Sequence, residues 1–149
     1  MFIRIVLVLL VLSCSVGLAQ AEWTKVMTGL DAGGYTLYFE PTSLRIDKKI
    51  GMVKMWLLYD FKTAQKDEKD DRVSYLSLRF ERQYDCKQER ARTLAQSLFD
   101  GNMARGKEIS KDSTESPWEP VAPGSIGESL WVMACGHVIG MPPGSQRYY

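Results

Sequence analysis

Two cysteines are the residues of this sequence whose chemistry is easiest to define. Cys86 and Cys135 stand 49 positions apart and are the pair left once the N-terminal leader described below is removed. An even number of cysteines in an exported chain indicates a disulfide. Neither cysteine belongs to a CxxC motif or stands near a second group of ligands, so the sequence predicts a structural bond rather than a metal site or a catalytic thiol.

Two other groups of residues invite a metal-binding interpretation. His137 stands four residues from both Met133 and Met141, and thioether and imidazole ligands suit monovalent copper. We expect Gly136 to end the helix that would align these three, so we predict no copper site. The acidic residues of segment 62–72 lack the alternating oxygen ligands and the turn glycine of a calcium loop, which favours a solvated loop.

No segment carries a motif for catalysis. The sequence contains no GxSxG or HExxH motif and no glycine-rich phosphate loop, and its one histidine stands close to the C-terminus. We therefore predict no catalytic residue, no cofactor and no enzymatic activity.

The first 21 residues have the organisation of a secretory signal peptide. A positively charged start is followed by the apolar run Ile5–Leu12 and by a small-x-small cleavage site at Ala19–Ala21. The apolar run is far shorter than the roughly 20 residues that span a bilayer. A second interpretation uses Cys14, because Val11–Cys14 resembles a bacterial lipobox, and lipidation there would anchor the protein to a membrane. Both interpretations predict export, to the periplasm or the outer-membrane surface of a Gram-negative bacterium.

Size and charge limit the class of protein. A chain of 149 residues with 45% hydrophobic and 25% charged residues is expected to form one globular domain. Loss of Arg4 with the leader leaves 18 basic and 18 acidic residues, so the mature chain is neutral and a nucleic-acid partner is not expected.

A long amphipathic strand is the element expected to organise the fold. Residues 73–86 alternate, with Leu76, Leu78 and Phe80 on one side and polar residues on the other, which predicts a half-buried antiparallel strand. Further strands are expected at 23–27, 35–39, 52–61 and around 107–110, with an extended edge at 45–47. Segment 62–72 is expected to close a hairpin between the third strand and the central one.

Two helices are expected to accompany this sheet. Asp85 and Gln88 have the spacing of a capping box before Lys87–Phe99, where Ala91, Leu94, Ala95 and Leu98 form an apolar stripe. A second, short helix is expected from Ser125 to Cys135, ended by Gly136. Residues 137–149 form the expected flexible tail. The predicted fold class is therefore α+β, an antiparallel sheet of about five or six strands with two helices and one disulfide.

Aromatic and basic side chains on the expected outer surfaces suggest a protein interface. They are Tyr38, Trp56, Tyr75, Arg79 and Arg82. Trp, Tyr and Arg are enriched at such interfaces. The competing interpretation places Trp56 and Tyr75 beneath the helices. Trp118, in a segment with three prolines, is expected to anchor that segment to the sheet.

The order of these features resembles the surface-adhesin protein E family. The resemblance is carried by Trp23, Tyr38–Leu44, Val53–Trp56, Ser74–Leu78, Tyr84–Cys86, Trp118–Ser125 and Cys135. It implies a small α+β domain over residues 22–136, held by the cysteine pair and able to dimerise. The founding member of the family is an outer-membrane lipoprotein that binds host matrix proteins. No binding residue is transferred by the resemblance.

Together these features predict an exported, non-enzymatic binding domain. Its expected partner is a protein, either of the host matrix or of the cell envelope, or a second copy of itself. A membrane is a partner only if Cys14 is lipidated. The alternative is a periplasmic small-molecule-binding or envelope stress protein with a pocket between sheet and helices.

Overall fold

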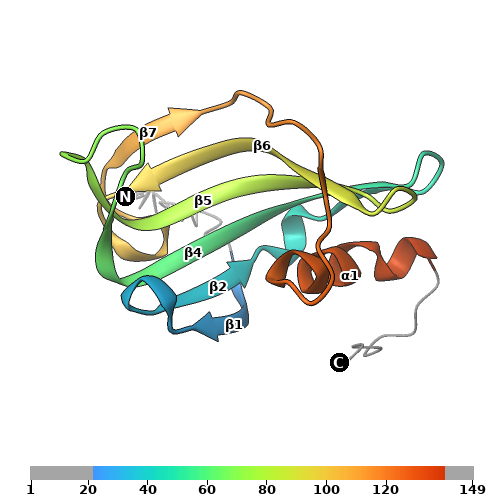
Figure 1. Ribbon diagram of the computed structural model, residues 1–149, viewed down its shortest axis with the longest axis horizontal. Coiled ribbons are helices and arrows are strands. Elements are labelled where there is room, and N and C mark those ends of the chain that lie inside the picture. Colours follow the sequence, from blue (N-terminus) through green and yellow to red (C-terminus); the bar gives the residue numbers. More distant parts are fainter. Residues whose placement is uncertain (1–21, 140–149) are drawn as a thin grey trace, which may run out of the picture.

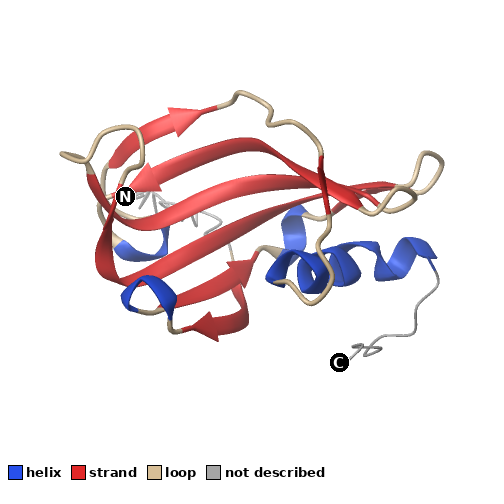
Figure 2. Cartoon of the chain, viewed as in Figure 1, coloured by secondary structure: helices blue, strands red, loops and turns tan. Residues whose placement is uncertain are grey.

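The structure, a computed structural model, describes residues 22–139, and for residues 137–139 only the backbone. These residues form one antiparallel sheet, one α-helix and three short 3-10 helices (Figures 1 and 2). The elements are β1 (Thr24–Gly29), η1 (Asp31–Gly33), β2 (Tyr35–Phe39), η2 (Pro41–Ser43), β3 (Arg45–Asp47), β4 (Met52–Lys66), β5 (Ser74–Asp85), β6 (Arg90–Phe99), η3 (Asn102–Ala104), β7 (Glu108–Asp112), β8 (Glu119–Pro120) and α1 (Ile126–Ile139).

The sheet is built from neighbouring hairpins around β4 and β5. The strands lie in the order β1-β2-β4-β5-β6-β7, and every pair is antiparallel. The two short strands extend existing edges: β3 pairs with the start of β4 beyond the end of β2, and β8 pairs with the start of β6 beyond β7. The eight-stranded sheet is larger than the five or six strands expected from the sequence.

The two faces of the sheet differ in what covers them. One face carries the main core, into which α1 inserts Leu130, Trp131, Ala134 and Cys135; we call it the helix-covered face. Alternate residues of β4 and β5 reach it, among them Val53, Met55, Leu57, Phe80 and Tyr84. Burial raises the pKa of the Tyr84 hydroxyl above its ordinary value, which keeps this side chain neutral in the core. The opposite face carries no α-helix of the described chain, and we call it the open face.

The expected disulfide joins the helix to the sheet. Cys86, directly after β5, is bonded to Cys135 of α1, with the two Cα atoms 5.5 Å apart. Both cysteines are buried in the core. The bond therefore closes the described domain from the end of its central strand to its last helix.

A buried carboxylate reinforces this junction. Asp85 accepts hydrogen bonds from the backbone N–H groups of Lys87 and Gln88, and a third at 3.0 Å from the Arg90 guanidinium. Its backbone carbonyl accepts a hydrogen bond from the indole of Trp131 in α1. One residue thus holds the β5–β6 turn, the start of β6 and the helix.

The helix expected over Lys87–Phe99 is wrong, since residues 90–99 form strand β6. A bulge opposite Glu81 and Arg82 inserts Leu94 as an extra residue. Ala91 and Leu98 pair with Tyr84 and Leu78 and so face the same side although seven positions separate them. The bulge thus gives a strand the apolar spacing of a helix. Asp85 does accept the backbone N–H groups of Lys87 and Gln88, as a helix cap would. These N–H groups belong to the tight turn between β5 and β6, not to a helix.

Other boundaries are closer to expectation. Strand β2 has the expected limits, and the expected edge at 45–47 is β3. The C-terminal helix forms, but it continues through Gly136 to Ile139, so Gly136 does not end it. The expected signal peptide, Cys14 with it, and residues 140–149 of the expected tail lie outside the described residues.

Loss of the disulfide should cost a large share of the stability. Replacing both Cys86 and Cys135 by serine removes a cross-link that closes 49 residues, for which chain entropy gives about 4 kcal/mol. Urea unfolding of the variant and of the oxidised protein measures the difference. The wild-type protein in reductant should unfold at the midpoint of the variant, and an unchanged midpoint in both would contradict the prediction.

Asp85 and Asp70 form a matched pair for testing the buried carboxylate. Each accepts a backbone N–H and an arginine guanidinium from a following residue, but the Asp85 side chain is 4% exposed and that of Asp70 36%. Asp85→Ala should destabilise the fold by about 3 kcal/mol, because it leaves buried donors and a cation unpaired. Asp70→Ala should cause no measurable change in the urea midpoint, and equal effects of the two substitutions would contradict this account.

Candidate binding surface

The centre of the open face is a cluster of aromatic and charged side chains. Register places Tyr38 beside Leu58, Leu58 beside Arg79, and Trp56 beside Glu81, on three adjacent strands. Leu58 is fully buried, whereas the four others are half-buried. They therefore cover an apolar residue from above while keeping part of their own surface accessible. We call Tyr38, Trp56, Arg79 and Glu81 the open-face cluster.

Arg79 is the central residue of this cluster. Its guanidinium lies 4.9 Å from the centroid of the Trp56 ring and 5.8 Å from that of Phe99. A cation over an aromatic face is stabilised by the quadrupole of the ring. The Nε of Arg79 is buried and donates no hydrogen bond within the described residues. The side chain is thus held by aromatic contacts instead of a carboxylate.

A shallow pocket of about 500 Å³ opens beside Trp56. Its lining combines Trp56 and Glu81 with side chains from the link between β2 and β3, namely Glu40, Thr42, Ser43 and Arg45. Ser43 fixes this link to the sheet, because its hydroxyl donates to the Glu40 carbonyl and accepts the Trp56 backbone N–H at 2.9 Å. The pocket is therefore a built feature of the sheet edge.

Hydrogen-bonding groups in this pocket remain available to a partner. The Arg45 guanidinium donates to the backbone carbonyls of Thr42 and Leu44, and one oxygen of Glu40 accepts from the Thr42 hydroxyl. The Glu81 carboxylate makes no ion pair or hydrogen bond within the described residues. The lining thus combines hydroxyl, carboxylate and guanidinium groups around one indole ring, an arrangement that suits recognition of polar groups.

A second arginine–tryptophan stack borders the open face at its β6 edge. The guanidinium groups of Arg90 and Arg92 lie 4.7 and 4.6 Å from the centroid of the Trp118 ring. Arg92 also donates to the Gln83 side chain and forms an ion pair with Glu115. Trp118 does anchor its segment to the sheet, as expected, and it does so through two arginines of β6.

The structure separates the five surface residues expected at an interface. Tyr38, Trp56 and Arg79 gather on the open face. Tyr75 and Arg82 lie on the helix-covered side, where Tyr75 packs edge-on against Phe61 and Arg82 donates to Thr93. The expectation that Trp56 is covered by a helix is wrong, because α1 packs on the other face. The residues missed were Glu40, Ser43 and Glu81, which come together beside Trp56 only once the chain is folded.

The remaining chemical candidates are placed as follows. Residues 67–73 form the solvated turn between β4 and β5, where Asp70 pairs with Arg72. His137 lies in α1 and Met141 outside the described part, so that set is untested. No cluster of three or more His, Cys, Asp or Glu residues that could hold a metal occurs within residues 22–139. In the same range no helix is long and apolar enough to cross a membrane.

Comparison with known proteins gives one family and one fold. The family model described as surface-adhesin protein E matches residues 23–136. A solved structure of Haemophilus influenzae protein E is similar over 78% of this chain and 95% of its own, with 13% identity and a TM-score of 0.56. Its crystal form II is similar over 68% and 81%, with 12% identity and a TM-score of 0.56. No curated protein matches. At these identities the structural likeness shows the fold alone.

A double-mutant cycle tests the stack at the centre of the cluster. Trp56→Leu and Arg79→Met each keep apolar cover over Leu58 and remove one partner of the cation–aromatic contact. We expect a coupling free energy of about 0.5–1 kcal/mol between the two, measured by urea unfolding. Pairing Trp56→Leu with Arg72→Met, in the distant β4–β5 turn, should give no coupling. Equal coupling in both cycles, or none in either, would contradict the assigned contact.

Proposed function

This chain belongs to the surface-adhesin protein E family, and we propose that it is an exported, non-enzymatic protein that binds another protein through the open face of its sheet. The observation that carries the proposal is the open-face cluster. Trp, Tyr and Arg are the residues most enriched among those that dominate the energy of protein interfaces. Here all three lie together at the centre of a face that the single described α-helix leaves uncovered.

The contacts of Arg79 support a binding role for this face. The guanidinium is held over two rings and has no carboxylate partner within residues 22–139, so its remaining donors are free for an acceptor on another molecule. Glu81 and Glu40 add hydrogen-bond acceptors in the neighbouring pocket beside Trp56. A partner that covers the cluster would exclude water from these groups and so strengthen each contact.

Two kinds of protein partner suit the proposal. One is an extracellular-matrix protein, as the family's description as a surface adhesin suggests, and the other is a second copy of this chain. A matrix-protein partner requires display on the outer surface of a Gram-negative bacterium. Self-association is also compatible with retention in the periplasm.

The pocket beside Trp56 favours one alternative, a periplasmic protein that binds a small molecule. The sequence placed such a pocket between sheet and helix, but the pocket described here lies on the open face. A rise in melting temperature with a polar metabolite, abolished by Ser43→Val, would favour this alternative. Protein binding that is unaffected by the same metabolite would favour the adhesin-like function.

Binding to defined proteins tests the proposal directly. The oxidised protein is immobilised and exposed to purified matrix proteins, and its self-association is measured by sedimentation. Trp56→Leu combined with Arg79→Glu should weaken the observed binding about 30-fold, the effect of losing an interface hot spot. Glu81→Lys, at a carboxylate without a partner in the described fold, should weaken it without lowering stability.

Matched controls separate the open face from general surface effects. Leu30→Ala and Arg72→Glu alter an exposed apolar and an exposed basic residue far from the cluster and should leave binding unchanged. Binding that survives both cluster variants would place the contact elsewhere. Absence of any binding or self-association by the folded, oxidised protein would overturn the proposed function itself.

A further inference from the structure

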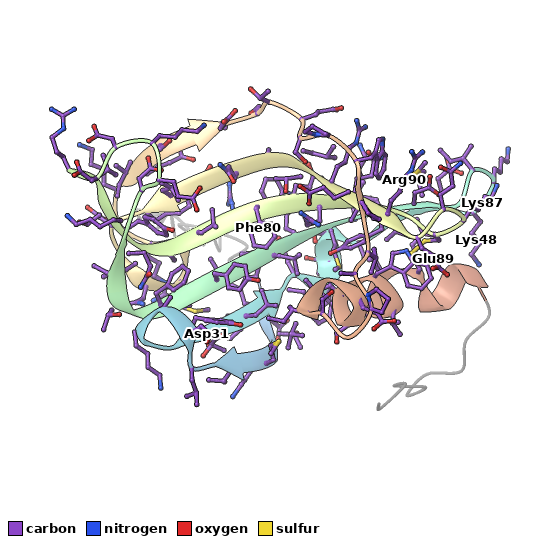
Figure 3. The ribbon with its side chains drawn as sticks, viewed as in Figure 1. Asp31, Lys48, Phe80, Lys87, Glu89 and Arg90 are labelled. Atoms are coloured by element: carbon purple, nitrogen blue, oxygen red, sulfur yellow. A yellow bond between two sulfur atoms is a disulfide. The ribbon has the colours of Figure 1, made fainter. Side chains whose placement is uncertain are left out.

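Two hairpin turns meet at one end of the sheet, on a surface separate from the open-face cluster. The first joins β3 to β4 and the second joins β5 to β6. The ammonium of Lys87 donates to the Lys49 carbonyl at 3.3 Å, and the Cys86 backbone N–H donates to the Gly51 carbonyl at 2.9 Å. Figure 3 shows Lys48, Lys87, Glu89 and Arg90 together at this end. We call residues 46–51 and 86–90 the hairpin tip.

The hairpin tip exposes apolar side chains that the fold does not use. Three large hydrophobic residues of the described chain are exposed, Leu30, Ile46 and Ile50, and two of them belong to the tip. Ile50 is 55% exposed and follows Lys48 and Lys49 directly. An isoleucine side chain exposed at a tight turn gains no free energy from burial in the fold. Contact with another apolar environment would supply that free energy.

Basic groups surround these isoleucines. Lys48, Lys49 and Lys87 are exposed. Three carboxylates lie nearby: Asp47 accepts the backbone N–H groups of Lys49 and Ile50, Asp85 is buried against Arg90, and Glu89 is exposed. The outer surface of the tip therefore presents more ammonium groups than free carboxylates, although the mature chain is neutral overall.

We propose that the hairpin tip docks on the surface of a bilayer that contains anionic phospholipid. Lysines meet the phosphate groups while Ile50 and Ile46 enter the apolar boundary below them, as in other interfacial contacts. A soluble polyanion would pair with the lysine ammonium groups but would bury no isoleucine side chain. The combination of exposed lysines and isoleucines therefore favours a membrane as the partner. The strands run away from the tip, which leaves the open face free for a protein while the tip is docked.

Flotation with vesicles tests this docking. The oxidised protein, with the N-terminus its host cell gives it, is mixed with vesicles of equal parts phosphatidylcholine and phosphatidylglycerol. Binding should fall as salt is added. Lys48→Glu combined with Lys49→Glu should lower the partition coefficient at least about 25-fold, from roughly fivefold per lysine. Ile50→Ser should lower it by about fivefold, since part of one side chain leaves the boundary.

Two controls match these substitutions at the other end of the molecule. Leu30→Ser alters a more exposed hydrophobic residue, 86% exposed, and Lys66→Glu combined with Lys107→Glu makes the same charge change far from the tip. Both should bind vesicles like the wild type. Every variant has the same N-terminus, so their differences report the tip alone.

A second readout remains informative when the N-terminus itself holds the protein on the vesicle. Ile50→Trp should shift its fluorescence to the blue on vesicles and be quenched by brominated lipid, and Leu30→Trp should do neither. Tip variants that bind like the wild type, together with an unquenched Trp at position 50, would overturn the proposal. So would retention on a soluble polyanion that depends on the lysines but not on Ile50, without any vesicle binding.

Discussion

The rest of the structure depends on the junction between the end of β5 and helix α1. A helix of fourteen residues is marginal on its own in water, and this one has a single sheet face to pack against. The Cys86–Cys135 bond and the hydrogen bond from Trp131 to the Asp85 carbonyl hold it there. Because this is the one α-helix of the described chain that covers the core, the junction also decides which face of the sheet the helix leaves uncovered.

An open face on a twisted sheet needs another way to protect its apolar residues. In β4 both faces carry buried leucines, Leu57 toward the helix and Leu58 away from it. On the open side Arg79, Trp56 and Tyr38 provide the cover that a second layer of helices gives in other folds. Such cover is amphipathic, so the same side chains that protect Leu58 remain able to contact a partner.

The sequence predicts the strands better than the elements between them. Alternation places Leu78 and Phe80 on the core side correctly, but Arg82, expected on the outer surface, lies on their side of the sheet. The 87–99 segment fails because one bulged residue converts a period of two into helical spacing, and tertiary pairing then decides the outcome. The pocket could not be predicted, since Glu40, Ser43 and Glu81 meet only through the pairing of strands distant in sequence.

The position of Cys86 links the covalent bond to the hairpin tip as well as to the core. Cys86 belongs to the β5–β6 turn, and its backbone N–H bonds to Gly51 of the β3–β4 turn. The disulfide therefore fixes both halves of the hairpin tip as well as α1. In the oxidised protein, one covalent bond thus links the helix that completes the core to the turn that forms half of the tip.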